Sequence, residues 1–357
     1  MIRIVEVTLN DIPFVSKFLS VHAPKVHDEK GWEDCLSWMW SSNPNVSNSH
    51  LKLGWCIKDD FGSIKAFIGS IPVTYYHCGK EVSALWGTSW YVDEEVRDYG
   101  LKMYFKFTSQ KLIILSNTQS EAVEIIMKKL RFNLFNSFWF ETVYLVPLNY
   151  GLFNNLKKLY FKNLSFNILL FLIGSFFLGV LSFFLRKIPK GNNISISVIE
   201  EFPYDTDEWF KVFQKATNFT LKRDLKVMSW LFCNSLSKND FLKISIYEQN
   251  ILLGFVIFKK KKLNTFLYLE LIDEVILPGK SHLLSTIYKK IKQELLITEP
   301  KCLFLILRRY SNFNPLWNKD FFGISIKKFM LKSYIKGLDI SESDCIISTL
   351  DGDYVFF

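Results

Sequence analysis

A stretch of 23 consecutive residues without a charged side chain, Asn163–Leu185, constrains the fold more than any other part of the sequence. A helix of about 20 apolar residues is long enough to cross a bilayer. The basic residues on its two sides are nearly balanced and predict no orientation across a membrane: Lys157, Lys158 and Lys162 before it, and Arg186, Lys187 and Lys190 after it. A spanning helix would also place the two halves of the chain on opposite sides of the membrane. We therefore favour a buried or membrane-surface helix that joins two modules over a transmembrane helix.

The composition is that of a folded protein without a metal or disulfide framework. Of its 357 residues, 49% are hydrophobic, which is enough for one large core or two smaller ones. Its six cysteines form no CxxC pair and its five histidines show no metal-ligand spacing, so we expect no metal. The alternating start Met1–Val7, followed by Asp11, is typical of a strand rather than of a secretory signal, which favours a cytoplasmic protein. A net charge of +9 allows an anionic partner, such as a nucleotide, a phosphate-bearing cofactor or a membrane surface.

The two halves of the chain, before and after Asn163–Leu185, share an internal plan. In each half the pattern predicts a helix and then two strands: a helix at 32–40 with strands at 51–58 and 64–76, and a helix at 223–232 with strands at 242–248 and 251–259. A Ser-Trp-aliphatic-aromatic step, at 37–40 and at 229–232, occupies the same place in both. Two copies of one α/β unit explain this pattern. The alternative is two unrelated helices, each with an aromatic face towards its own core.

Further along the first half, the sequence predicts a strand directly followed by a helix. The run 82–92 is apolar and rich in β-branched and aromatic residues, which favours a strand that ends at the acidic residues 93–95. The run 101–107 can place its apolar side chains on one side of a helix. Gly100, between the two, would let the backbone turn and leave the first helical N–H groups pointing outward. Such a helix start can hold a phosphate.

These residues resemble the GNAT acyltransferases. The pyrophosphate loop of that family reads Arg/Gln-x-x-Gly-x-Gly/Ala, and residues Arg97-Asp98-Tyr99-Gly100-Leu101-Lys102 keep its first four positions, with Lys102 in place of the small final residue. The order that follows also resembles the family: a strand at 112–115, a helix at 122–130, and Lys129-Leu130-Arg131-Phe132 with Arg131 in place of a glycine. In the second half, Leu277–Ser281 occupies the position of the loop.

Over nearly the whole chain, the plan resembles tandem-GNAT enzymes of surface-polysaccharide biosynthesis, including that of O-antigen and lipopolysaccharide. The resemblance implies an α/β fold of two modules, each a mixed sheet flanked by helices: an N-terminal module at 1–150, an apolar helical connector at 151–195 and a C-terminal module at 196–357. It implies transfer of an acyl group, such as 3-hydroxybutyryl, from acyl-CoA to the amine of a nucleotide-linked amino sugar of the dTDP-3-amino-3,6-dideoxyhexose type. We expect a cytoplasmic enzyme that works near the membrane face, with coenzyme A as co-substrate and no nucleic acid partner.

The resemblance also assigns residues to the site. The N-terminal module would hold coenzyme A, and the C-terminal module would shape the acceptor pocket. The residues expected to contact coenzyme A are Tyr91, Val92, Arg97, Asp98, Tyr99, Gly100, Leu101 and Lys102.

Four further side chains are candidates for catalysis. Ser116 and Asn117 follow the strand at 112–115, where the departing thiolate can take a proton; the alternative for Asn117 is a turn. His77 is a candidate base, although we favour a histidine in a surface hairpin at this position. Asp273, a carboxylate in an apolar strand, must be hydrogen-bonded, paired or perturbed in its pKa, and we favour it as a contact to the amine or the sugar. We expect Asp224, by contrast, to cap a helix.

Two other functions stay open. The tandem-GNAT peptidyltransferases take an aminoacyl group from transfer RNA, a donor that suits the positive charge. Those enzymes need no coenzyme A loop, whereas Arg97–Gly100 resembles one. The other alternative is a non-catalytic scaffold that residues 163–185 attach to a membrane.

Overall fold

The computed structural model describes residues 3–46, 51–116, 121–135, 143–148, 193–234, 239–263, 266–308, 324–326, 333–337, 345–346 and 356. The uncharged stretch and Asn117 lie outside these residues. Within them, no helix combines the length and the apolar character that crossing a membrane requires.

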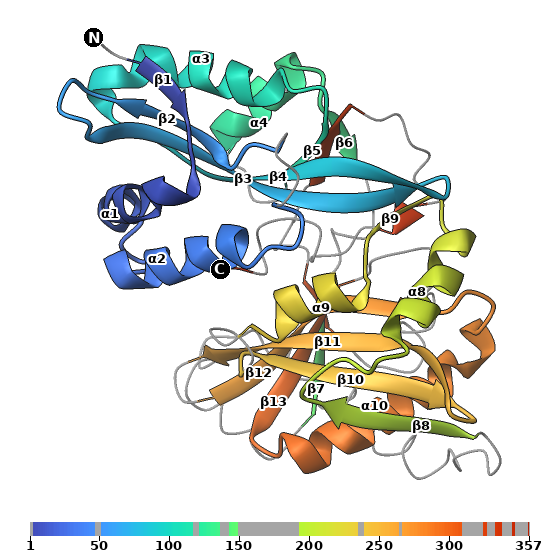
Figure 1. The fold of residues 1–357 in the computed structure, drawn as a ribbon. Helices are drawn as coiled ribbons and strands as arrows, with labels where there is room; N and C mark the ends of the chain where they lie inside the picture. Colours follow the sequence, from blue (N-terminus) through green and yellow to red (C-terminus); the bar gives the residue numbers. More distant parts are fainter. Residues whose placement is uncertain are drawn as a thin grey trace. The chain divides into compact units, whose positions relative to one another are not determined.

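The chain forms two compact units, each assembled from separate segments (Figure 1). Unit 1 comprises Met1–Ser137, Glu201–Asn239 and Leu331–Phe357, and unit 2 comprises Phe138–Glu200 and Asp240–Met330. These boundaries differ from the module boundaries expected at 150 and 196. The last residues of the first half, from Phe138, belong to unit 2, and two segments of the second half, Glu201–Asn239 and Leu331–Phe357, belong to unit 1.

Unit 1 contains a mixed sheet, sheet A, in the order β1-β2-β3-β4-β5-β15-β6. The strands are β1 (Arg3–Glu6), β2 (Gly54–Lys58), β3 (Ile64–His77), β4 (Lys80–Val92), β5 (Ile113–Ser116), β15 (Ser333–Lys336) and β6 (Asn133–Phe135). Two short strands, β9 (Phe219–Leu221) and β16 (Cys345–Ile346), extend it beside β3. The expected strands of the first half are therefore confirmed.

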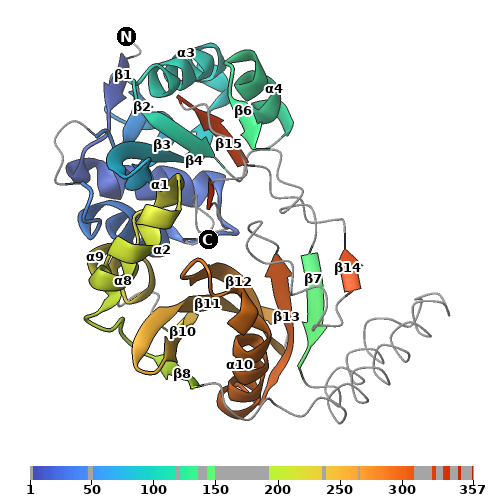
Figure 2. The same cartoon turned by 90° about the vertical axis from the view of Figure 1, so that its right-hand side faces the viewer.

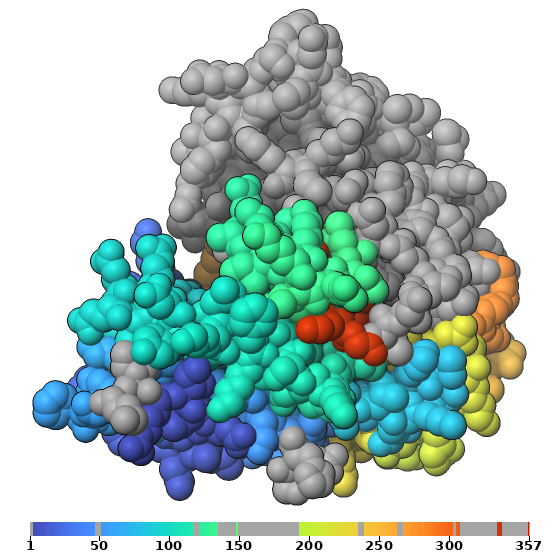
Figure 3. Space-filling view, turned by 90° about the horizontal axis from the view of Figure 1, so that it is seen from above, coloured from blue at the N-terminus to red at the C-terminus, as the bar shows by residue number. Residues whose placement is uncertain are grey.

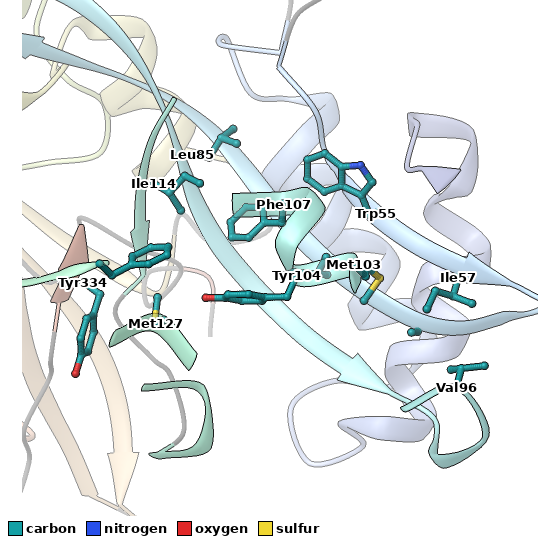
Figure 4. Packing of buried hydrophobic residues seen from close by; sticks show 13 residues of the cluster. Trp55, Ile57, Leu85, Val96, Met103, Tyr104, Phe107, Ile114, Met127 and Tyr334 are labelled. Carbon is teal, nitrogen blue, oxygen red and sulfur yellow. The ribbon is translucent and has the colours of Figure 1, made fainter. Parts of the chain in front are cut away.

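Helices cover both faces of sheet A. In Figure 1, α3 (Arg97–Thr108) and α4 (Glu121–Lys129) lie on one face, and α1 (Ile12–His22) and α2 (Glu29–Leu36) lie on the other. Figure 4 shows the core between the sheet and the first pair, where apolar side chains alternate along the strands and recur at helical spacing. Its central members are Trp55, Ile57, Leu85, Met103, Tyr104, Phe107, Ile114 and Met127.

Unit 1 also contains two helices from the second half of the chain, α8 (Thr206–Phe213) and α9 (Leu225–Phe232). The carboxylate of Asp224 accepts a hydrogen bond from the backbone N–H of Val227 at 2.9 Å. The predicted helix cap is thereby confirmed.

Unit 2 contains sheet B, in the order β8-β10-β11-β12-β13-β7-β14. Its strands are β8 (Ile194–Ile199), β10 (Phe241–Glu248), β11 (Ile251–Leu263), β12 (Phe266–Ile276), β13 (Cys302–Arg308), β7 (Val143–Pro147) and β14 (Ile324–Ile326). The long helix α10 (Leu284–Thr298) covers one face (Figure 2).

The two sheets follow one plan and exchange a strand. β7 comes from the first half of the chain but pairs with β13 and β14 in sheet B. β15 comes from the second half and pairs with β5 and β6 in sheet A. In each sheet the fourth and fifth strands, β4–β5 and β12–β13, are parallel. The prediction of two α/β modules built on the same plan is confirmed.

The repeated Ser-Trp steps contact each other inside unit 1. Trp38 lies in a π-helical turn after α2, and Trp230 lies in the last turn of α9. Each indole Nε1–H donates to the other residue's backbone carbonyl, and both donor–acceptor distances are 2.8 Å. A two-fold relation between equivalent segments produces such reciprocal contacts. The pair therefore favours two copies of one unit over two unrelated helices.

Candidate functional site

A β-bulge interrupts β4. Phe67 of β3 pairs with Tyr91 and Gly69 pairs with Thr88, so β4 has one residue more than β3 over this interval. Ser89, inside the bulge, has a φ of 48°, which is unusual for a residue with a side chain. A Cβ atom on Gly69 would lie 2.8 Å from the Thr88 Cγ2 atom, so a larger residue opposite the bulge would displace the neighbouring side chains. Bulges of this kind re-aim side chains and are common beside active sites.

Beyond the bulge, β4 and β5 separate. Their parallel pairing ends at Trp86 and Leu115, and β5 ends at Ser116. β4 continues through Gly87–Val92, a length of about 20 Å at 3.3 Å per residue. We call this stretch the free edge of β4, because no strand among the described residues pairs with it on the β5 side.

The helix α3 begins directly after the free edge. A 3₁₀ turn, Glu94–Val96, leads into it, and no side chain caps its first N–H groups. Residues 97–102, which the sequence predicted as a phosphate-binding loop, instead form the first turns of α3. Gly100 has a helical φ and serves packing, because a Cβ atom there would lie 3.0 Å from the Val92 Cγ2 atom. The glycine thus lets α3 approach the end of β4 closely.

The start of α3 carries more negative charge than its resemblance to a phosphate loop suggests. Four carboxylates lie in or beside its first turn, those of Asp93, Glu94, Glu95 and Asp98. Two of them are paired: the His22 Nε2 atom lies 2.9 Å from Asp93 Oδ1, and the Lys65 Nζ atom lies 3.4 Å from Glu95 Oε2. Carboxylates at a helix start interact favourably with its dipole and compete with a bound phosphate.

Positive charge at the same helix comes from Arg97 and Lys102, which are both exposed. The Lys102 Nζ atom lies 4.9 Å from the centroid of the Tyr99 ring, a cation–π contact. Further along, Lys106 lies in the last turn of α3. Figure 3 shows the outer surface of α3 and α4, in teal and green, on one face of unit 1.

Trp90, inside the bulge, packs against α3. The Trp90 ring stacks on Tyr104 of α3, with ring centroids 4.4 Å apart. The Trp90 Nε1 atom is buried and donates to no acceptor in the part of the chain that the structure describes. Burial raises the pKa of the Tyr104 hydroxyl, which keeps that group protonated.

The structure brings the predicted coenzyme A residues together. Tyr91 and Val92 end β4, and residues 97–102 form the first turns of α3. Ser116 ends β5, the strand beside which the free edge begins. Sequence reasoning missed His22 and Lys65, whose contacts to the acidic run join positions far apart in the chain and leave no local signal.

His77 and Asp273 lie elsewhere. His77 ends β3 and pairs with Lys80, nine residues and about 30 Å along the strand from Ile68, which lies opposite the bulge. The structure therefore does not bring His77 to the free edge. Asp273 is fully buried in β12 of unit 2.

No protein-family model and no curated protein matches this chain. Solved structures do. The chain is similar to the N-myristoyltransferase of Saccharomyces cerevisiae with bound myristoyl-CoA, at 13% identity over 96% of this chain and 84% of the other, with a TM-score of 0.54. It is similar to a GCN5-related N-acetyltransferase from Anabaena variabilis, at 9% identity over 94% and 72%, with a TM-score of 0.56. A probable N-acyltransferase from Enterococcus faecalis gives the same identity and coverage, with a TM-score of 0.57.

At these identities the likeness shows a shared fold. The chain has an α/β fold of two GNAT-like modules, as the sequence predicted.

Proposed function

We propose that the chain is an N-acyltransferase that takes its acyl group from acyl-CoA and holds this donor on unit 1. The observation that carries the proposal is the free edge of β4, which leads directly into a helix start without a side-chain cap. An extended chain with amide groups, such as the pantetheine arm, can pair with a strand edge, and a diphosphate can bind at a helix start. The shared fold with N-acyltransferases supports the same function.

Two observations bear on the fit of coenzyme A. The Trp90 Nε1–H inside the bulge, which has no acceptor among the described residues, is a donor that a bound ligand can satisfy. The carboxylates at the start of α3 act in the opposite direction, although Lys65 forms an ion pair with Glu95 and the His22 ring contacts Asp93. Arg97 and Lys102 are the side chains that would hold the diphosphate.

Acyl-CoA supplies a thioester, whose carbonyl carbon is open to attack by an amine. A C–N bond forms, the C–S bond breaks, and a proton passes from the amine to the sulfur. Backbone N–H groups at the bulge, near Trp90 and Tyr91, stabilise the negative charge on the carbonyl oxygen. Ser116, at the end of β5, donates a proton towards the departing sulfur, directly or through water.

The acceptor in this proposal is the amine of a nucleotide-linked amino sugar of the dTDP-3-amino-3,6-dideoxyhexose type, used for surface polysaccharide. Its support is the sequence resemblance to the tandem-GNAT sugar N-acyltransferases. Asp273, a buried carboxylate in unit 2, is the proposed contact to that amine. The enzyme would work in the cytoplasm near the membrane face.

The second candidate is a tandem-GNAT peptidyltransferase that uses aminoacyl-tRNA. The four carboxylates at the start of α3 favour it, because they weaken a diphosphate site there. The net charge of +9 also suits a nucleic acid donor.

Calorimetry with coenzyme A and acetyl-coenzyme A separates the two candidates. We expect binding, and we expect Arg97→Ala to weaken it about tenfold, because a charge-assisted hydrogen bond to phosphate is worth about 1.5 kcal/mol. Lys106→Ala is the matched control, since Lys106 is exposed on the same helix but in its last turn. Equal affinities of the two variants would exclude the role of Arg97, and a folded protein that does not bind coenzyme A would favour the transfer-RNA donor.

A further inference from the structure

The outer surface of α3 and α4 combines exposed apolar side chains with basic ones. Phe105 of α3 is 46% exposed, and Ile125 of α4 is 57% exposed. Lys106 directly follows Phe105, and Lys128 and Lys129 lie one helical turn after Ile125; all three are exposed. We call the group that these residues form with the exposed Arg131 the α3–α4 surface: Phe105, Lys106, Ile125, Lys128, Lys129 and Arg131.

The two helices end at the same edge of sheet A. β4 and β5 are parallel, and β5 and β6 run in the same sense because both pair antiparallel with β15. α3 connects β4 to β5 and α4 connects β5 to β6, so both helices run against these strands. The Lys336 Nζ atom joins their ends: it donates to the Thr108 carbonyl of α3 at 3.1 Å and lies 5.5 Å from the centroid of the Phe132 ring, just after α4. Figures 1 and 2 show the helices side by side.

The C-terminal halves of both helices carry a strong excess of positive charge. Residues 101–111 and 124–131 contain six basic residues and one acidic residue, Glu124. The Glu124 side chain is only 12% exposed, and it accepts a hydrogen bond from the Tyr334 hydroxyl. Within the described part of the chain, no carboxylate forms an ion pair with Lys106, Lys129 or Arg131. The α3–α4 surface is therefore positively charged.

Neither its charge nor its apolar residues would identify a partner separately. Basic residues in the last turn of a helix interact favourably with the helix dipole, and single exposed apolar residues are common on protein surfaces. Their combination on two neighbouring helices is different. Apolar side chains bordered by lysine and arginine are typical of helices that lie in the interface of a membrane. The long basic side chains cover apolar surface with their alkyl stems while their charged ends reach the phosphates.

We propose that the α3–α4 surface binds a lipid bilayer that contains anionic lipids. Phe105 and Ile125 enter the boundary between headgroups and acyl chains, and the four basic residues contact lipid phosphates. The proposed donor site lies at the other end of α3, because Arg97 is nine residues and about 14 Å from Lys106 along the helix axis. Membrane contact and donor binding therefore use different residues, and this inference does not depend on the proposed acyl transfer.

Co-sedimentation of the full chain with vesicles tests the proposal. One set of vesicles contains phosphatidylcholine alone, and the other contains equal parts of phosphatidylcholine and phosphatidylglycerol. We expect binding to the anionic vesicles that weakens as salt is added. Lys106→Gln/Lys129→Gln should weaken it about 25-fold, because each basic residue near such a surface contributes about fivefold. Phe105→Ser/Ile125→Ser should weaken it at least about tenfold through the loss of apolar burial.

The matched control is Phe14→Ser/Lys17→Gln. It also replaces an exposed phenylalanine and an exposed lysine on a helix, but that helix is α1, on the other face of sheet A (Figure 1). This variant should bind the vesicles like the wild type. Thermal unfolding of all variants verifies that the substitutions, which lie at the surface, leave the fold intact.

Four outcomes would overturn the proposal. The first two are no binding of the wild type to anionic vesicles, and an equal loss in the control variant. If both α3–α4 variants bound like the wild type, another part of the chain, such as the uncharged residues 163–185, would make the contact. If only the lysine variant lost binding, the partner would be recognised by charge alone, as an RNA would be. Vesicle binding without coenzyme A binding, in contrast, would refute the proposed donor and keep the α3–α4 surface.

Discussion

Trp38→Phe should lower the free energy of unfolding of unit 1 by at least about 2 kcal/mol more than Trp55→Phe does. Both tryptophans are buried, at 6% and 3% exposure, so both substitutions remove the same atoms from a core. Trp38 Nε1–H donates to the Trp230 carbonyl in the last turn of α9, where no helical N–H follows to replace it. Leaving that carbonyl without a donor costs about 1–3 kcal/mol.

Trp55 provides the contrast, because its Nε1 atom is buried without an acceptor among the described residues. Its removal therefore relieves a desolvation cost of about 1–3 kcal/mol, which adds to the difference between the two variants. In a unit of about 200 residues, 2 kcal/mol corresponds to a Tm difference of about 4–8 °C, measurable by thermal unfolding.

Trp230→Phe is the internal control. It removes the reciprocal bond at the same distance and should match Trp38→Phe within about 0.5 kcal/mol. Equal Tm values for Trp38→Phe and Trp55→Phe would refute the reasoning, since the hydrogen bond would then contribute nothing beyond the packing of the ring.

Three further predictions concern charge, thiol reactivity and strand exchange. A hydrogen bond from Lys222 holds the pKa of the Glu81 carboxyl below its ordinary value near 4.5, so its stabilisation is present at neutral pH and is lost as the pH falls through the folded pKa. Glu81→Gln should therefore lower the free energy of unfolding by about 0.5 kcal/mol at neutral pH and leave it unchanged in strong acid, as measured from urea midpoints. An equal loss at the two pH values would contradict the pairing of Glu81 with Lys222. Burial raises the pKa of the Cys56 thiol to about 11. At mildly alkaline pH a disulfide reagent should therefore label the exposed Cys78 first and Cys56 only when the protein unfolds, and mass spectrometry would identify the labelled residue. Fast labelling of Cys56 in the folded protein would contradict this prediction. A truncated chain of residues 1–150 lacks β15, the strand that lies between β5 and β6 in sheet A. It should show no cooperative unfolding transition by circular dichroism. A sharp transition would mean that unit 1 folds without the exchanged strand.

Local patterns in the sequence predicted most of the elements that position the site. The strand that ends at Val92, the helix that follows it and the cap at Asp224 depend on residues within a few positions of one another. The reason for Gly100 was wrong in detail, because its role is the contact with Val92 rather than a turn. Close approach between two elements depends on where both lie, and a local pattern records only one of them.

The sequence alone therefore determined the class of the fold, the presence of two similar modules and the strand-to-helix junction, since helix caps, periodicity and turn residues act over a few neighbouring positions. Only the tertiary structure decided that the modules exchange β7 and β15, and that His22 and Lys65 pair with the acidic run. These features join residues tens to hundreds of positions apart. Their energies come from register and burial, which exist only after the chain has folded.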